Sequence, residues 1–107
     1  MKWRVLRRLD KDVVAHYVRP HRGVYMLTKS ESGSPRYVGR ASKLYERLSA
    51  HAQNGHYNFF TFEYIDSPRQ CFVRECTLYH RHRKAIDNQN HPTADSGANW
   101  RCPVCGF

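Results

Sequence analysis

The sequence predicts one small α/β domain of the α+β type, in which a three-stranded, mainly antiparallel sheet is flanked by helices. The chain has 107 residues, enough for one compact domain and too few for two. Three runs rich in Val, Tyr and Phe have the composition of β-strands. Helical segments alternate with them in the order α-β-β-α-β-α. Elements in this order form a layered domain around one core.

The first helix is expected over residues 9–18, "LDKDVVAHYV", where either Asp10 or Asp12 can cap its start. Two strands are then expected over residues 23–28 and 36–40, because both runs are rich in Val and Tyr. The linker between them consists of turn-forming residues. The two strands therefore form a hairpin or a closely related two-strand unit.

The second helix is expected over residues 42–54, with Ser42 as its N-cap and Gly55 near its end. Apolar residues recur along it at intervals of four, which places them on one side of a helix. These residues are Leu44, Leu48 and Ala52.

The third strand is expected over residues 57–65, "YNFFTFEYI", with aromatic side chains on at least one face. The last helix begins at Ser67-Pro68, a cap followed by proline, and extends to about Ile86. The chain then becomes irregular after Asn88. We expect residues 1–92 to form the domain, and residues 93–107 to form a cysteine-bearing tail packed on it.

Charge points to a polyanionic partner. Lys and Arg number 18 against nine Asp and Glu, so the net charge is +9, and the basic residues are distributed along the whole chain. A small domain with this field attracts nucleic acid first and an anionic membrane surface second. A basic domain without such a partner is the plainer alternative.

The N-terminal stretch "MKWRVLRRLD" carries positive charge but no apolar run, so we do not expect a secretory signal. No run of the sequence has the length of a membrane-spanning helix. We therefore expect an intracellular, cytoplasmic protein without a membrane partner. In that compartment the four cysteines are expected to be thiols or metal ligands rather than disulfides.

Two short triplets form a recognisable motif. Gly23-Val24-Tyr25 is followed, after eleven residues, by Tyr37-Val38-Gly39. With the residues that follow in register, the pattern resembles the GIY-YIG nucleases, which include the first-cut domain of bacterial excision repair, homing endonucleases and restriction enzymes. The resemblance covers roughly residues 22–92, with Val in place of Ile in both triplets. The further matching residues are Arg47, His51, Glu75 and Asn88.

The resemblance implies a GIY-YIG fold and a metal-dependent endonuclease acting on DNA. In that reading Tyr25 activates the attacking water and Tyr37 hydrogen-bonds the scissile phosphate. Their hydroxyls can enter one cleft if both side chains lie on the same face of adjacent strands. A phenol is a poor base unless a cation lowers its pKa. Two ordinary strand tyrosines, with hydroxyls in water, are the alternative.

Arg47 and His51 are four residues apart and so share one face of the second helix. By the resemblance Arg47 stabilises charge on the phosphate, for which a guanidinium fork is well suited. His51 could donate a hydrogen bond to the phosphate or move a proton near neutral pH. The alternative is a hydrated polar face on a surface helix.

Glu75 lies among apolar residues at helical spacing, on or beside the inward face of the last helix. A buried carboxylate needs a cation or a metal ion beside it. Because Mg²⁺ needs few protein carboxylates, Glu75 is the candidate ligand for Mg²⁺ or Mn²⁺. A salt bridge to Arg47 or Arg74 is the expected resting alternative. Asn88 is expected to support the site, with Asn90 near enough to replace it.

Several arginines are candidates for binding the nucleic-acid backbone. DNA is the expected partner, and RNA stays open because a site centred on phosphate does not read the sugar. A noncatalytic binding module with the same fold is the second hypothesis. A double-strand break would need a second copy or a partner protein, and the oligomeric state is open. The candidate backbone-binding residues are Arg22, Arg36, Arg40 and Arg74.

The tail contains Cys102 and Cys105 in a CxxC loop followed by glycine, which is half of a zinc knuckle. A structural zinc site needs four ligands, and His91 is the expected third. A redox pair, two free thiols, a site completed by another chain, and a zinc-organised interaction domain are alternatives. The other candidates for the missing ligand are His80, His82, Cys71 and Cys76.

Overall fold

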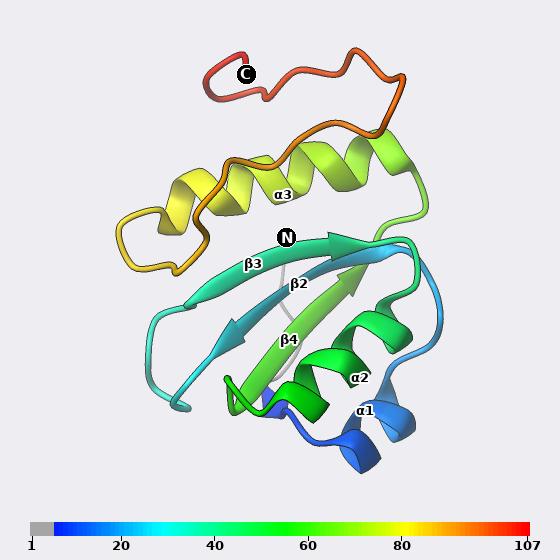
Figure 1. The fold of residues 1–107 in the computed structure, drawn as a ribbon, viewed down its shortest axis with the longest axis vertical. Helices are drawn as coiled ribbons and strands as arrows, with labels where there is room; N and C mark the ends of the chain where they lie inside the picture. The colour runs from blue at the N-terminus through cyan, green and yellow to red at the C-terminus, as the bar shows by residue number, and fades with distance from the viewer. Residues whose placement is uncertain (1–5) are drawn as a thin grey trace.

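The computed structural model describes residues 6–107. Residues 1–5, where the stretch considered above as a signal sequence begins, lie outside the described residues. The described chain forms one sheet with helices on both of its faces (Figure 1). Its strands are β1 (Arg7–Arg8), β2 (Gly23–Thr28), β3 (Tyr37–Ala41) and β4 (Phe59–Tyr64), and its helices are α1 (Lys11–Tyr17), α2 (Leu44–Asn54) and α3 (Pro68–His82).

The sheet has four strands in the order β1-β4-β2-β3, and every neighbouring pair is antiparallel. The α+β class and the antiparallel sheet are confirmed, but the expected count of three strands is wrong. The additional strand, β1, consists of Arg7 and Arg8, which pair with Phe60 and Phe59. Two residues are too few to show the alternation by which a strand is detected in a sequence.

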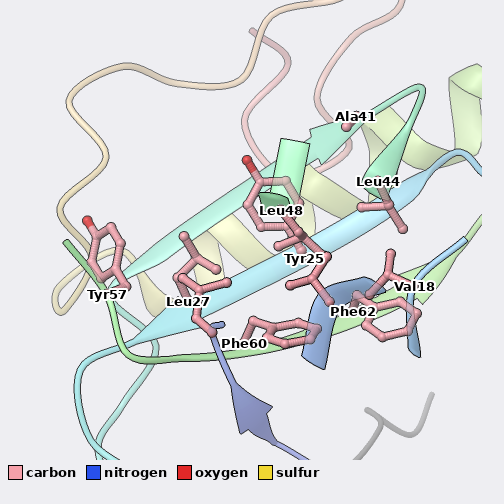
Figure 2. Packing of buried hydrophobic residues seen from close by; sticks show 11 residues of the cluster. Val18, Tyr25, Leu27, Ala41, Leu44, Leu48, Tyr57, Phe60 and Phe62 are labelled. Carbon is pink, nitrogen blue, oxygen red and sulfur yellow. The ribbon is translucent and has the colours of Figure 1, made fainter. Parts of the chain in front are cut away.

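β2 lies inside the sheet, and all six of its residues are buried because both faces are covered. On the face of α1 and α2, Tyr25 and Leu27 pack with aromatic and aliphatic side chains from the neighbouring elements (Figure 2). On the opposite face, Val24 and Met26 pack against α3. The side chains alternate between the two faces as a pleated strand requires. β3 forms one edge of the sheet.

The first two helices differ in how they begin. Asp10 caps α1, its carboxylate accepting from the amides of Asp12 and Val13 at 2.7 and 3.4 Å. The expected Ser42 cap of α2 is wrong, because Lys43 occupies the cap position without a side-chain hydrogen bond. Gly55 ends α2 with a φ of 75°, the left-handed conformation that glycine adopts readily.

α3 begins as expected, with the Ser67 hydroxyl accepting from the Gln70 amide and proline in the first turn. It ends at His82 rather than near Ile86. The chain turns there, with the amide of Ala85 bonding the carbonyl of His82, and the amide of Asp87 then bonds the carbonyl of Arg36, the residue before β3. No helix within residues 6–107 is both long and apolar enough to cross a membrane.

After α3 the chain is irregular. It first contacts β3, where Asn88 bonds Val38 and where Thr93 and Asp95 bond Arg40, and its last residues lie on the side of α3 that faces away from the sheet (Figure 1). Cys102 packs there with Phe72 and Cys76, and Ala94 and Trp100 pack against the same cluster. α3 therefore lies between the sheet and the end of the tail around Cys102.

Candidate functional site

Tyr25 and Tyr37 project from β2 and β3 onto the sheet face that α2 covers. Their ring centroids are 6.2 Å apart, and the ring planes are inclined by 27°. Tyr25 is completely buried, whereas Tyr37 is partly exposed. The two phenols of the motif thus lie side by side.

The glycines of the two triplets are required by close packing. Gly39 lies opposite Tyr25 in the β2–β3 ladder, and a Cβ on Gly39 would come within 2.5 Å of the Tyr25 hydroxyl oxygen. A Cβ on Gly23 would lie 2.2 Å from the carbonyl oxygen of Glu63 on β4. Gly39 therefore leaves the space that the Tyr25 ring occupies, and Gly23 allows β4 to approach β2.

α2 brings His51 to the tyrosine pair. Nε2 of His51 lies 3.0 Å from the Tyr25 hydroxyl oxygen, and the imidazole centroid is 5.4 Å from both phenol rings. Burial lowers the pKa of His51, and the charge of Arg47 lowers it further. His51 is therefore neutral at pH 7 and can accept a proton at Nε2 when Nδ1 carries the ring hydrogen.

Burial also raises the pKa of the Tyr25 hydroxyl. The neighbouring Tyr37 adds to the rise, and the Arg47 guanidinium opposes it. A phenol in this environment stays protonated at neutral pH. Tyr25 can then hand its proton to His51, but it does not persist as a phenolate.

A cleft of about 430 Å³ lies beside this cluster. It brings Arg47 of α2 to the same space as Glu75 of α3, although these helices cover opposite faces of the sheet. Side chains from the two faces of the sheet can meet here because β3 is an edge strand and no further strand separates them. Tyr25 and Tyr37 do not line this cleft. The lining residues are Arg22, Arg40, Ala41, Ser42, Arg47, Cys71, Glu75, His91, Pro92, Thr93 and Asp95.

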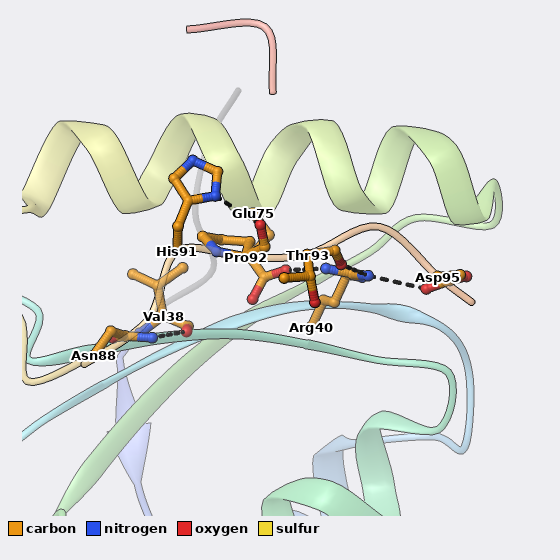
Figure 3. Close-up of polar contacts among 8 residues, drawn as sticks. All are labelled: Val38, Arg40, Glu75, Asn88, His91, Pro92, Thr93 and Asp95. Carbon is orange, nitrogen blue, oxygen red and sulfur yellow. Dashed lines mark hydrogen bonds and ion pairs between the residues drawn. The ribbon is translucent and has the colours of Figure 1, made fainter. Parts of the chain in front are cut away.

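Arg40 connects two acidic residues at the cleft (Figure 3). Its Nη1 donates to Oε1 of Glu75, which is buried with 8% of its surface exposed. Its Nη2 donates to the carbonyl oxygen of Thr93 at 2.6 Å and to Oδ1 of Asp95 at 2.9 Å. The guanidinium therefore spans α3 and the C-terminal segment.

The expected resting salt bridge from Glu75 to Arg47 or Arg74 is wrong, because the partner is Arg40. Tyr37 points to the α2 face, so strand alternation sends Arg40, three residues later, to the α3 face. Arg74 instead lies near Glu63, with its Nε 3.7 Å from Oε1 of that residue. Because Arg40 bonds Glu75, Thr93 and Asp95, it is engaged within the chain rather than presented to solvent.

Glu75 is suited to a divalent cation by its chemistry. Burial raises the pKa of its carboxyl, and the Arg40 guanidinium opposes that rise. A positive charge already lies at this carboxylate, and the oxygens of Asp95 and Thr93 converge on the same guanidinium. Carboxylate and carbonyl oxygens at a cleft are the donors that Mg²⁺ and Mn²⁺ prefer.

Asn88 binds the edge strand. Its Nδ2 donates to the carbonyl of Val38 at 2.8 Å, and its Oδ1 accepts from the amide of Val38 at 3.0 Å. Both bonds are made beside Tyr37, so Asn88 holds the backbone that carries this phenol. Asn90 is exposed.

The arginines expected to bind nucleic acid differ in their surroundings. Arg36 forms an ion pair with Asp87 at 2.9 Å, and Asp87 also accepts from the Tyr57 hydroxyl at 3.0 Å. Arg22 lines the cleft and is partly exposed. Arg22 is therefore the residue of this set placed to meet a phosphate at the cleft.

A second cluster lies where the tail meets the end of α3. Ligand atoms of His80, His91, Cys102 and Cys105 all lie within 4.8 Å of one another, so the cluster could hold a metal ion. Nε2 of His91 is 3.2 Å from Nε2 of His80 and 3.4 Å from Sγ of Cys105. Donors around a tetrahedral zinc ion are about 3.3–3.8 Å apart, given bonds of about 2.0–2.3 Å.

The protonation of the cluster favours metal binding. Nδ1 of His91 is 2.6 Å from the Pro92 carbonyl oxygen, which can only accept, so Nδ1 carries the proton and Nε2 is available. Burial alone would raise the pKa of the Cys102 thiol, but the backbone amides of Cys105 and Val104 help to lower it to about 6. Of the candidates for the fourth ligand, His80 joins this cluster.

Asp95 and Thr93 were not predicted from the sequence. Their contacts with Arg40 join residues more than 50 positions apart, which no local pattern reveals. One signal was available, since Asp95 is the only acidic residue that follows Asp87 in a basic chain.

No protein-family model matches this chain, and no curated protein matches its sequence. Among solved structures, the chain is similar to the GIY-YIG N-terminal endonuclease domain of UvrC from Thermotoga maritima, a point mutant bound to its catalytic divalent cation. The TM-score is 0.52 at 19% identity, and the match covers 67% of this chain and 91% of that one. At this identity the similarity shows the fold, and it confirms the expected GIY-YIG-like architecture.

Proposed function

We propose that this protein is a metal-dependent endonuclease that hydrolyses phosphodiester bonds in DNA. The observation that carries the proposal is the 3.0 Å contact between the Tyr25 hydroxyl and His51, beside a cleft lined by Arg47 and Glu75. The net charge of +9 supports a polyanionic substrate. The likeness to an endonuclease domain supports the same reaction class.

In the proposed reaction, Tyr25 and His51 act as a proton relay. The relay requires a water to enter beside the buried Tyr25 hydroxyl when substrate binds. That attacking water passes a proton to the Tyr25 oxygen while Tyr25 passes its own proton to Nε2 of His51. The water oxygen forms a bond to phosphorus, and the bond to the departing oxygen breaks with its electron pair. The departing oxygen takes a proton from solvent, and His51 returns its proton to solvent. The relay avoids a free phenolate, which burial of Tyr25 disfavours.

The other residues bind and orient the phosphate. Tyr37 is partly exposed beside Tyr25 and donates a hydrogen bond to a phosphoryl oxygen. Arg47 lines the cleft and stabilises the charge that builds on the phosphoryl oxygens. Asn88 keeps Tyr37 in place through the backbone of Val38.

Glu75 is the proposed ligand of Mg²⁺ or Mn²⁺, and a bound ion would neutralise charge on the phosphoryl oxygens. One carboxylate is sufficient when waters and substrate complete the coordination. Arg22, on the lining of the same cleft, holds the nucleic-acid backbone close to Glu75.

We propose that the cluster of His80, His91, Cys102 and Cys105 binds one structural zinc ion. Two thiolates and two imidazoles form a complete tetrahedral set, which leaves no open position for chemistry. The ion would fasten the tail to α3, since His80 belongs to α3 and both cysteines belong to the tail.

RNA is the second candidate substrate. A noncatalytic binding module is the second candidate function, and one observation favours it, because Arg40 already neutralises Glu75. Incubation with supercoiled, linear, branched and single-stranded DNA, and with RNA, with and without Mg²⁺, separates these alternatives. We expect Mg²⁺-dependent nicking of DNA that EDTA abolishes. Binding without cleavage of every substrate in Mg²⁺ and in Mn²⁺ would leave the noncatalytic module.

A further inference from the structure

Arg40 holds Glu75 and the C-terminal segment together. Its Nη1 bonds the Glu75 carboxylate, while its Nη2 bonds both the Thr93 carbonyl and the Asp95 carboxylate. Only 18% of the Arg40 side chain is exposed, and its guanidinium carbon lies 5.1 Å from the centre of the Phe72 ring. The guanidinium is therefore a fixed internal cation at the carboxylate on which the proposed function depends.

A guanidinium and a divalent cation compete for one carboxylate. They carry like charges, and repulsion at the separation of a shared ligand is large in a partly dry site. Arginine cannot lose its proton in a protein, so Arg40 must move rather than become neutral. The energetic cost of that movement depends on which acceptors remain for its donors.

We propose that residues 91–95 form a receiving site for Arg40. When a divalent cation binds Glu75, Nη1 leaves that carboxylate while Nη2 stays bonded to Asp95 and Thr93. Asp95 is then a positioning residue, because it keeps the displaced guanidinium paired and so favours cation binding at Glu75. This inference rests on the proposed role of Glu75.

The His/Cys cluster holds the receiving site in place. His91 is the first residue of the segment 91–95, a member of the cluster and part of the cleft lining. Pro92 is buried and accepts from Nδ1 of His91, and Ala94 packs against the cluster of Phe72, Cys76 and Cys102. An ion bound by the His/Cys cluster would therefore hold the chain on both sides of residues 92–95, at His91 and at Cys102. Loss of that ion loosens the acceptors of Arg40 and weakens cation binding at Glu75.

Mn²⁺ binding to the zinc-loaded protein, measured by electron paramagnetic resonance at pH 8 without nucleic acid, tests this inference. Asp95→Asn should weaken binding by roughly threefold to tenfold, the effect of a partly exposed charge pair. Arg40→Gln should tighten it, and adding Asp95→Asn in that background should change nothing further. Glu31→Gln, which removes one exposed negative charge from the loop between β2 and β3, is the matched control.

An Asp95→Asn effect no larger than the control overturns the inference. So does an equal effect with and without Arg40, because Asp95 would then act on the cation directly. Mn²⁺ binding that Glu75→Gln leaves unchanged also overturns it. The Mn²⁺-binding measurement contains no nucleic acid, so its result does not depend on whether the protein cuts DNA. A failure to cut DNA in the separate cleavage assay therefore counts against the proposed function alone.

Two further measurements do not require an Arg40 variant. Cys105→Ser alters an exposed ligand and should weaken Mn²⁺ binding about as much as Asp95→Asn, without additivity in the double variant. Nuclear magnetic resonance of the guanidinium groups should show that Mg²⁺ shifts the Arg40 signals while the Arg40 N–H hydrogens stay protected from exchange with solvent. Asp95→Asn should remove that protection from exchange. Arg40 signals that Mg²⁺ leaves unchanged overturn the inference.

Discussion

The hydroxyl oxygen of Tyr25 lies 3.0 Å from Nε2 of His51, although the two residues come from different elements, β2 and α2. Tyr25 is completely buried, and its pKa is raised by that burial. His51 is partly buried, and its pKa is lowered. The pair therefore combines a phenol that retains its proton with an imidazole that is free to take one.

The pH dependence of cleavage should report the ionisation of His51. Its pKa is lowered from the ordinary 6.5, so the neutral form predominates at pH 7, and the rate should fall only as pH drops below 6.5. His51→Gln keeps a polar side chain but cannot take a proton. It should lower the single-turnover rate by about a hundredfold to ten-thousandfold and remove this step of the profile.

This pH profile should be recorded with saturating Mn²⁺, so that protonation of Glu75 does not dominate. A step above pH 6.5, or one that persists in His51→Gln, would contradict the relay.

Gly39→Ala should disturb Tyr25 directly. The added methyl would lie within 2.5 Å of the Tyr25 hydroxyl oxygen, and the completely buried ring has little space to move. We expect a loss of about 1–3 kcal/mol in the free energy of unfolding, as for an overpacked core. Urea denaturation measures it.

Gly33→Ala is the matched control for Gly39→Ala. Its added methyl would meet the Ser30 hydroxyl in the exposed loop, where a flexible side chain can move aside. Equal stability losses in the two variants would show that Gly39 has no particular role beside Tyr25.

Much of this fold could be predicted, because β2, α2 and the start of α3 have strong local signals in the sequence. β1 could not, since two residues carry no periodicity, and neither could the end of α3, after which the chain turns and Asp87 bonds the backbone of the distant Arg36. Helix α2 begins without a side-chain cap, so Ser42 was misleading. These errors concern the ends of elements, where tertiary contacts override local preference.

The site residues divide in the same way. Tyr25, Tyr37 and His51 follow from the motif and the helical spacing, and the structure brings them together. The ion pair between Glu75 and Arg40 could not be predicted from the sequence, because it depends on which face of the sheet α3 covers. Asp95 depends on the path of an irregular tail, which carries no periodic pattern.

Removal of the cluster thiols should release zinc and loosen the tail. We expect one zinc ion per chain in protein purified without chelator, measured by mass spectrometry, and none in the Cys102→Ser, Cys105→Ser double variant. Tm should fall by at least about 4 °C, the shift that about 1 kcal/mol produces in a small domain.

Val104→Ala, at an exposed position between the two cysteines, is the control and should keep both zinc and Tm. Absence of zinc from the wild-type protein would remove the zinc proposal.

DNA binding should depend steeply on salt, because a charge of +9 binds phosphates largely without regard to sequence. Arg22→Gln should reduce the slope of log affinity against log salt by roughly one, as for the loss of one phosphate contact. Arg36→Gln should change it less, since Arg36 is paired with Asp87. Fluorescence anisotropy measures both, and an affinity that stays flat between low and physiological salt contradicts the prediction.

The most direct test of a nuclease centred on Tyr25 and Glu75 is the single-turnover cleavage rate of Tyr25→Phe. This variant keeps the ring and its packing but removes the hydroxyl that faces His51. We predict a loss of about a hundredfold to ten-thousandfold. Glu75→Ala should abolish Mg²⁺-dependent cleavage with DNA binding equal or slightly tighter, and Tyr37→Phe should lose only a phosphate contact. A folded Tyr25→Phe protein that cuts DNA at the wild-type rate would contradict the account.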